Sequence, residues 1–336
     1  METKTRSLIR RGPLVAAALF ATVFAASADP VSELKSFSVF DQVDLPALAQ
    51  NEAKAVRGEP MNTARFLSVQ TCWVAPGTPA QQLEAMRRWN PARYSDLKVY
   101  LHTNGSNFSR LSSAPNNSSV QSLVSATVNK SSELQISRAE AAKLPSGAPA
   151  AMSGPVASFW SGVLSARAQA FASGGSSAQP PYDFSGQAIR PGDELSGLLR
   201  EQGKIRKQFS GLLGNSGIGR GGGGKPEQYW ELVDVDGKGA LTLGASYSHA
   251  AAGGSMQAAD VLYYSSGGFY VGLTLYQMWP VEVNGKPSTL VWRGDMISSA
   301  ELAGLAGVER LGSESSMMKD VSRAVRLFRR DSSGGR

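Results

Sequence analysis

The segment GIGRGGGGKPEQYW contains the most conspicuous candidate for phosphate chemistry in this chain of 336 residues. Gly219, followed after four residues by Gly224 and Lys225, matches the first part of a P-loop, in which backbone N–H groups surround phosphates and the lysine reaches the terminal ones. The next residue is Pro226, which lacks the hydroxyl that binds magnesium and resists the helix that should begin there. We therefore expect a flexible linker and no bound nucleotide.

A second candidate is DVDGKGALTLGA, whose beginning resembles a calcium-binding loop. Asp234 and Asp236 occupy the first and third ligand positions of such a loop. The fifth position, however, is Lys238, and the twelfth is Ala245, where a bidentate glutamate is required. The dipeptide Asp236-Gly237 lies between two apolar runs, which is typical of a hairpin turn. This pattern predicts a turn without calcium.

Histidine and cysteine offer few further sites. The only two histidines are His102 and His249, so a three-histidine zinc site is impossible, and the motifs H-E-x-x-H and G-x-S-x-G do not occur. We interpret His249 as a residue at the end of a strand rather than a base. The single Cys72 has apolar neighbours, which predicts a buried and inert thiol. We expect no metal and no cofactor, and we assign no catalytic residue.

Paired carboxylates need separate attention, because two of them are enough for glycoside hydrolysis. Glu231, Asp234, Asp295 and Glu301 lie in or beside the β-rich end of the chain. Their spacing does not single out a pair, and charged residues at strand ends are mostly solvated. Aromatic residues are also concentrated in this region, although an ordinary hydrophobic core is their commoner use.

The beginning of the chain has the three parts of a secretory signal peptide. Basic residues come first, an apolar run follows from residue 14 to 25, and Ala26-Ser27-Ala28 forms the A-x-A site. The run of twelve residues is shorter than the roughly 20 that cross a bilayer. We expect cleavage after Ala28, a periplasmic or secreted protein, and no stable membrane insertion.

The charge of the chain changes with that assignment. The leader contains four basic residues and one acid, so the formal net charge falls from +7 to +4 when it is removed. The remaining basic residues are scattered among acids and do not alternate with aromatic residues on one face, as nucleic-acid grooves require. Nucleic acid is therefore not an expected partner.

The rest of the chain is expected to form one domain, at residues 61–330. Residues 29–60 are predicted to be an extension with one helix at 45–56, and residues 331–336 a disordered tail. Within the domain, residues 104–226 are predicted to be a helical and loop insertion that ends in the Gly-rich linker. A strand at 64–75, followed by a helix that begins after Thr78, is expected before the insertion.

The C-terminal part is predicted to be a β-meander followed by a helix. Four or five strands alternate with Gly-containing turns, of which Asn284-Gly285 is one. Leu241, Leu243 and Tyr247 are expected on one face of their strand. The helix is predicted at 299–330, with apolar residues along one side and Gly312 as the place where it could bend.

This order of elements resembles the START and polyketide-cyclase-like helix-grip superfamily. The segments that carry the resemblance are FLSVQTCWVAPGTPAQQLEAMRRWNP, YYSSGGFYVGLTLYQMWPV, TLVWRGDMIS and GVERLGSESSMMKDVSRAVRLFRRD, and it covers residues 64–330. It implies an α+β fold in which a curved antiparallel sheet surrounds the long C-terminal helix and leaves an apolar cavity. The long insertion between Lys98 and Pro226 departs from a compact member.

The resemblance implies that the cavity binds a lipid or another hydrophobic small molecule. The candidate wall residues, from the sheet and the terminal helix, are Leu241, Leu243, Tyr247, Tyr263, Leu273, Trp292, Met318, Val321 and Val325. We expect an exported binding protein without enzymatic activity. Two alternatives stay open: a cyclase-like or hydrolytic enzyme that uses the same cavity, and an envelope interaction protein whose core is filled.

Overall fold

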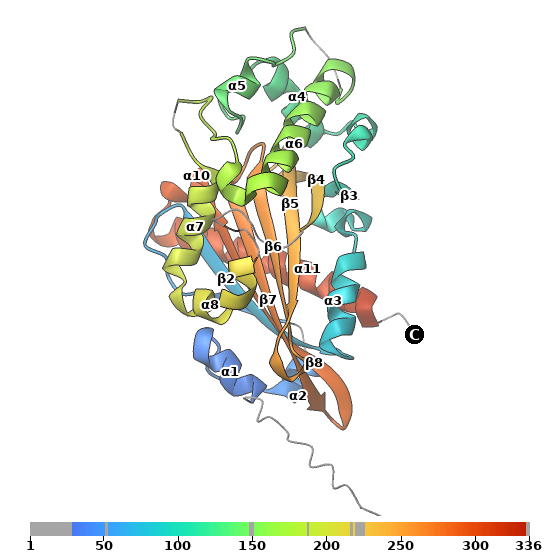
Figure 1. Cartoon of the computed structure of the whole chain (residues 1–336), viewed down its shortest axis with the longest axis vertical. Helices are drawn as coiled ribbons and strands as arrows, with labels where there is room; N and C mark the ends of the chain where they lie inside the picture. The colour runs from blue at the N-terminus through green and yellow to red at the C-terminus, as the bar shows by residue number, and fades with distance from the viewer. Residues whose placement is uncertain are drawn as a thin grey trace, which may run out of the picture.

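The protein is an α+β structure built on one eight-stranded antiparallel sheet (Figure 1). The structure, a computed structural model, describes residues 29–50, 53–147, 151–186, 188–215, 218 and 226–333. The predicted leader with its cleavage site and Lys225 of the Gly-rich segment lie outside these residues. The strands are β1 (Lys54–Arg57), β2 (Phe66–Pro76), β3 (Val99–Asn104), β4 (Glu227–Val235), β5 (Lys238–Ala250), β6 (Met256–Ser265), β7 (Val271–Val283) and β8 (Lys286–Ser298).

The strand order is β1-β2-β8-β7-β6-β5-β4-β3, so the strands from β4 to β8 form a meander of successive neighbours. Two of its turns have the backbone that tight hairpins require, because both central residues have positive φ. The angles are 49° and 83° at Asp236 and Gly237, and 51° and 70° at Asn284 and Gly285. Both predicted turns are therefore confirmed. β2 pairs with β8, which places the first long strand of the chain beside the last.

The larger core lies on one face of the sheet, beneath a layer of helices. In Figure 1, α7 (Pro191–Glu201) and α8 (Gly203–Gln208) lie at the left of the strands, with α1 (Pro30–Phe37) below them. Their apolar side chains join those of alternate strand residues in one continuous cluster. Leu34 and Phe37 are fully or almost fully buried in it, so the segment that precedes β2 contributes to the core of the domain.

The opposite face is covered by α3 (Pro79–Arg88) and by the C-terminal helix α11 (Gly307–Ser333), which crosses behind the sheet in Figure 1. α3 begins after Thr78, as its sequence predicts, and the structure adds a capping box, since the side chains of Thr78 and Gln81 each accept a hydrogen bond from the other's backbone N–H. The cluster on this face is smaller and includes Trp73, Val321 and Val325.

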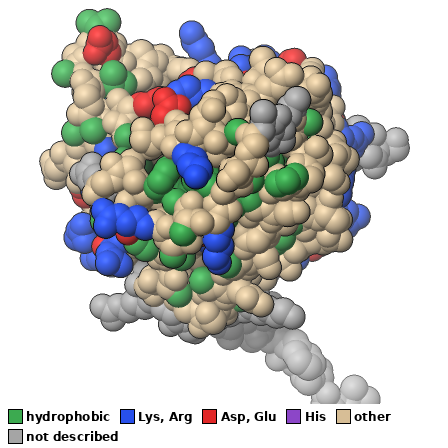
Figure 2. Space-filling model, turned by 90° about the horizontal axis from the view of Figure 1, so that it is seen from above, with side chains coloured by type: hydrophobic (Ala, Val, Ile, Leu, Met, Phe, Trp, Pro, Cys, Tyr) green, Lys and Arg blue, Asp and Glu red, His purple; other side chains and the backbone are tan. Residues whose placement is uncertain are grey.

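The remaining helices lie mostly in the insertion between β3 and β4. They are α2 (Leu45–Gln50), α4 (Ser118–Val128), α5 (Arg138–Ala141), α6 (Gly154–Gly174), α9 (Ser210–Asn215) and α10 (Ala300–Ala303), with short 3-10 turns at 91–93, 95–97, 109–113, 175–178 and 252–254. None of the described helices is both long enough and apolar enough to cross a membrane. Viewed from the end that the insertion occupies, hydrophobic side chains show near the middle, and Lys and Arg side chains lie at separate points around them (Figure 2).

Two helix predictions are wrong in their boundaries. The helix predicted at 299–330 is divided into α10 and α11, because Gly307 has a φ of 53° and interrupts the helical backbone. Val308 and Leu311, near the start of α11, are exposed, at 83% and 43%. The helix predicted at 45–56 ends at Gln50, and its last residues form β1, because pairing with the edge of β2 overrides their helical propensity.

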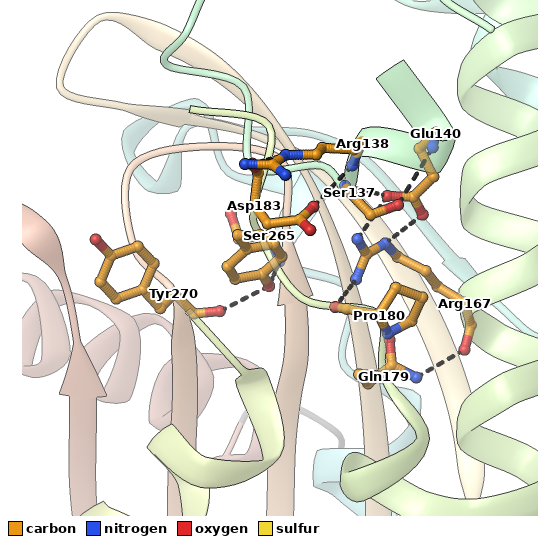
Figure 3. A network of polar contacts seen from close by, with 10 residues as sticks. Ser137, Arg138, Glu140, Arg167, Gln179, Pro180, Asp183, Ser265 and Tyr270 are labelled. Atoms are coloured by element: carbon orange, nitrogen blue, oxygen red, sulfur yellow. Dashed lines mark hydrogen bonds and ion pairs between the residues drawn. The ribbon is translucent and has the colours of Figure 1, made fainter. Parts of the chain in front are cut away.

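A buried arginine attaches the insertion to the sheet (Figure 3). Arg167 of α6 is fully buried, and its Nε and Nη2 donate to the carboxylate of Glu140 at 2.8 and 2.6 Å. Its Nη1 donates to the carbonyl oxygen of Pro180 at 3.1 Å, and its guanidinium lies 4.3 Å from the ring centre of Tyr264 in β6. The arginine therefore joins three segments of the insertion to one strand.

Candidate functional site

A pocket of about 770 Å³ lies between the second face of the sheet and the helices α3 and α11. Side chains point alternately to the two faces of a strand, so this pocket receives the strand residues that do not enter the larger core. Its walls are largely apolar and aromatic, and they include Trp73, Leu83, Met86, Trp89, Val321, Val325 and Phe328. Its volume is in the range of sites for small organic ligands.

The sheet side of the pocket is polar. We call this set of residues the polar floor: His102 of β3, Tyr229 and Glu231 of β4, Asp260 of β6, Thr274 and Tyr276 of β7, and Arg293 of β8. The antiparallel register places Asp260 directly opposite Thr274, and Thr274 opposite Asp295. The floor is therefore assembled across five strands, and no short segment of the chain contains it.

Asp260 is the central acid of the floor. The hydroxyl of Tyr229 donates to its Oδ1 at 2.7 Å, although β5 separates the two strands. The ring crosses β5 over Gly244, where a Cβ would lie 2.2 Å from Cζ of Tyr229. Within the described part of the chain, the carboxylate of Asp260 has no other hydrogen bond and no ion pair. A glycine in β5 is thus what allows the phenol to reach this carboxylate.

Burial raises the pKa of Asp260 to about 6, because the charged carboxylate loses hydration. The hydrogen bond from Tyr229 opposes this rise in pKa, the charge of Glu231 adds to it, and the charges of Arg293 and His102 oppose it. The Asp260 side chain is half-buried and lines the pocket. Burial also raises the pKa of Tyr229 well above its usual range, so the phenol remains a neutral donor.

Two further pairs complete the electrostatics of the floor. Nδ1 of His102 lies 2.9 Å from a carboxylate oxygen of Glu231, and both side chains are about 15% exposed. Nη2 of Arg293 donates to Oδ1 of Asp295 at 2.6 Å and its Nε to Oδ2 at 2.8 Å, so the charge of this arginine is neutralised locally. The described residues contain no group of three or more His, Cys, Asp or Glu that could hold a metal ion.

An aromatic contact closes one end of the pocket. The indole N–H of Trp89 donates to Asp331 of α11 at 3.2 Å, and the hydroxyl of Tyr94 donates to the same carboxylate. The ring of Trp89 meets Phe328 of α11 edge to face, with 5.9 Å between the ring centres. These contacts hold the C-terminal end of α11 against the segment that follows α3.

The structure brings together only part of the predicted wall. Tyr247, Val321 and Val325 line the pocket. The residues Leu241, Leu243, Tyr263, Leu273 and Trp292 belong to the larger core on the other face of the sheet, so their assignment to the cavity is corrected. Met318 does not line the pocket and packs beside the small cluster of Leu67 and Val69. The reason is the alternation of strand side chains, since these five sheet residues point toward the face that the larger core occupies. Tyr247 lies on the same face of β5 and also packs against the larger core, although it lines the pocket near the end of the strand.

The polar residues that sequence reasoning considered are placed as follows. His102 and Glu231 lie in the pocket, whereas His249 is exposed near the end of β5. Asp295 forms an ion pair with Arg293, and Glu301 is exposed. Asp234 lies outside the pocket, where it accepts a hydrogen bond from the Gly237 N–H and so supports the hairpin turn. Burial raises the pKa of the Cys72 thiol to about 12, so the prediction of a buried thiol is confirmed.

Asp260, Tyr229 and Arg293 were missed by sequence reasoning. A signal was nevertheless present, because Tyr229 and Glu231, and likewise Arg293 and Asp295, are polar pairs at alternate positions within strands rather than at strand ends. Such pairs indicate a polar sheet face. They do not reveal that helices cover that face and enclose it.

We expect Asp260→Asn to stabilise the protein at pH 8 by about 1 to 3 kcal/mol, because the folded state no longer contains a buried charge. The folded pKa of about 6 lies above the ordinary 3.8, so the wild type loses stability as pH rises from about 4 to 6. The variant should show a flatter stability profile in that window. Chemical denaturation at several pH values measures this difference, and equal profiles for the two proteins would contradict it.

Comparisons with protein-family models, with curated proteins and with solved structures found no match to this chain. The functional conclusion therefore depends on the geometry of the pocket itself. The polar floor has a half-buried acid with no ion-pair partner among the described residues, a neutral phenol that orients it, and apolar walls above it. These features suit the binding of an organic molecule with one polar end.

Proposed function

We propose that this chain is an exported protein that holds a hydrophobic small molecule or lipid in the pocket between the sheet and α11. The observation that carries the proposal is the pocket of about 770 Å³ whose walls are apolar and aromatic. A structural domain would bury such side chains against one another, because unfilled apolar space costs stability. The pocket is also open enough at its rim to admit a ligand from solvent.

The order of the elements supports the same proposal. From β2 onward, a long strand and a short helix come first, the meander follows the insertion, and a terminal helix covers the sheet face that contains the pocket. This is the arrangement that the resemblance to the helix-grip superfamily implies, with the insertion and the N-terminal helices added on the opposite face. Export is proposed from the leader pattern in residues 1–28.

We expect Val321→Phe to reduce the binding of an apolar probe at least tenfold while the melting temperature changes little. Val321 lies on α11 and lines the pocket, so the added ring would occupy space that the ligand needs. A titration with an uncharged fluorescent alkyl probe and a thermal unfolding curve measure the two effects. The matched control is Val308→Phe, which makes the same change at an exposed position of the same helix and should leave probe affinity unaltered.

The two results separate a binding pocket from a filled core. If the core were full, the phenylalanine would force its neighbours out of their preferred rotamers at a cost of about 1 to 3 kcal/mol. A large loss of stability in Val321→Phe, together with no probe binding to the parent protein, would therefore reject the proposal. It would favour a structural role at the cell envelope.

A second candidate, an enzyme that transfers protons in the same pocket, is favoured by the acid Asp260 and the neighbouring pair of His102 and Glu231. A carboxyl with a pKa of about 6 exchanges its proton near neutral pH, which suits a general acid or base. Prolonged incubation with a bound ligand distinguishes the candidates. Recovery of the ligand unchanged supports binding alone, whereas conversion that is lost in Asp260→Asn would support the enzyme.

A further inference from the structure

We propose that the pocket selects organic cations, in which an amine or quaternary ammonium group is carried on an apolar body and lies beside Asp260 and Glu231. This inference rests on the proposed function, because it names the class of hydrophobic ligand that the same pocket takes. The apolar part of the ligand would contact the walls formed by α3 and α11. The charged end would lie on the polar floor.

The first argument is the balance of charge on the floor. Two carboxylates, Asp260 and Glu231, face the pocket. Arg293 is the cation of the sheet face, and it is held in a bidentate pair by Asp295, whose side chain is only 6% exposed. His102 is within hydrogen-bond distance of Glu231 and not of Asp260. Among the described residues, therefore, no cation is paired with Asp260 at ion-pair distance.

The second argument is the cost of burying that carboxylate. A charge that is removed from water without a partner destabilises the folded protein, unless a ligand supplies the opposite charge. Tyr229 provides one neutral hydrogen bond to Asp260, and the other carboxylate oxygen has no donor among the described residues. A ligand cation would compensate this charge, whereas an uncharged lipid would bury it further.

The third argument is the ring content of the pocket. The aromatic side chains that line it are Trp73, Trp89, Tyr229, Tyr247, Tyr276 and Phe328. Ring faces attract cations because of their quadrupole, and Trp and Tyr do so better than Phe. The floor already contains one such contact, since the guanidinium of Arg293 lies 5.5 Å from the ring centre of Tyr276. Rings and carboxylates together form a suitable environment for an ammonium group.

An anionic ligand fits these observations less well. Arg87 at the rim of the pocket is paired with Glu84 at 2.7 Å and with Glu227 at 3.1 Å. Arg293 is paired with Asp295, as described above. A fatty-acid carboxylate would therefore have to compete with existing pairs and approach Asp260 and Glu231, which repel it.

The test compares three probes of equal chain length: decyltrimethylammonium, decanol and decanoate, each below its micelle or solubility limit. Calorimetric or tryptophan-fluorescence titration of the mature protein at pH 8 should show the ammonium probe binding at least tenfold more tightly than the other two. Asp260→Asn should reduce affinity for the ammonium probe at least tenfold and leave affinity for decanol unchanged. Its melting curve confirms that this variant is folded.

The matched control is Asp236→Asn, which removes the same charge at an exposed turn where asparagine also tolerates positive φ. It should leave the affinity for all three probes unaltered. If Asp236→Asn lowers the affinity for the ammonium probe as much as Asp260→Asn does, the net charge of the protein, rather than the polar floor, determines that affinity. The inference is then wrong.

The affinity for the ammonium probe should also fall between pH 8 and pH 5 as Asp260 takes up a proton, because its pKa is about 6. The titratable and charged groups around the pocket are His102, Glu227, Tyr229, Glu231, Tyr247, Tyr276, Arg293 and Asp295 on the sheet, with Arg87 and Asp320 from α3 and α11. The fall should be absent in Asp260→Asn. A fall that persists in that variant would assign the titration to another of these groups and contradict the inference.

The remaining outcomes are distinguishable. Equal affinity for the three probes would leave the hydrophobic pocket in place and reject the selection of cations. Tighter binding of decanoate would reject it in favour of an anionic ligand at Arg293. Failure of all three probes to bind the parent protein would reject the proposed function together with the inference.

Discussion

Arg167→Met is expected to lower the free energy of unfolding by about 3 to 5 kcal/mol, which is the usual cost of removing one partner from a buried ion pair. The substitution leaves the carboxylate of Glu140 without the two donors that it has in the wild type. It also removes the donor to the carbonyl of Pro180 and the cation over the ring of Tyr264. Urea denaturation followed by circular dichroism measures the loss.

Two variants test whether the buried charge is the cause. Arg138→Met removes an exposed arginine from the same network, where its side chain donates to the carbonyl of Asp183, and it should cost less than about 1 kcal/mol. Adding Glu140→Gln to Arg167→Met should recover part of the stability, because the unpaired charge is then absent. An effect of Arg167→Met as small as that of Arg138→Met would show that the network of Figure 3 is not required.

Gly244→Ala is expected to reduce the affinity of the pocket for an apolar probe at least tenfold. It should also lower the free energy of unfolding by about 1 to 3 kcal/mol. The new Cβ would lie 2.2 to 2.4 Å from the end of the Tyr229 ring, and β5 is held by pairing on both sides. The ring must therefore leave its position over β5 and give up its hydrogen bond to Asp260. The displaced ring enters the space that the ligand needs.

A double-mutant cycle with Tyr229→Ala separates this clash from a general effect of alanine in the strand. Without the ring, Gly244→Ala has no side chain of Tyr229 to displace and should cost little. The two substitutions should then be strongly non-additive in chemical denaturation. Additive effects would mean that the contact between the ring and this glycine does not determine the structure of the floor.

Local features of the chain could be predicted from the sequence because they depend on neighbouring residues. The turns at Asp236-Gly237 and Asn284-Gly285 follow from residues that accept positive φ. The start of α3 follows from Thr78, a residue type that is favoured immediately before a helix. The alternation that places Leu241 and Leu243 on one face follows from the period of two in a strand, and the structure has both residues in the same core.

The position and the polar floor of the pocket could not be predicted from any local sequence pattern. Alternation shows which residues share a face, but it does not show which face meets α11. Helices from the insertion and from the segment before β2 cover the apolar face, so the terminal helix covers the mixed face, and the pocket acquires a polar floor.

The contact between Tyr229 and Asp260 likewise spans three strands and depends on their register. The pairing of β5 with β6 shifts its register between Leu243 and Gly244, the residue over which the ring crosses. The sequence by itself determined the two hairpin turns, the start of α3 and which residues of a strand share a face. Only the tertiary structure decided which polar residues meet, because strand register and helix placement arise from packing between segments far apart in the chain.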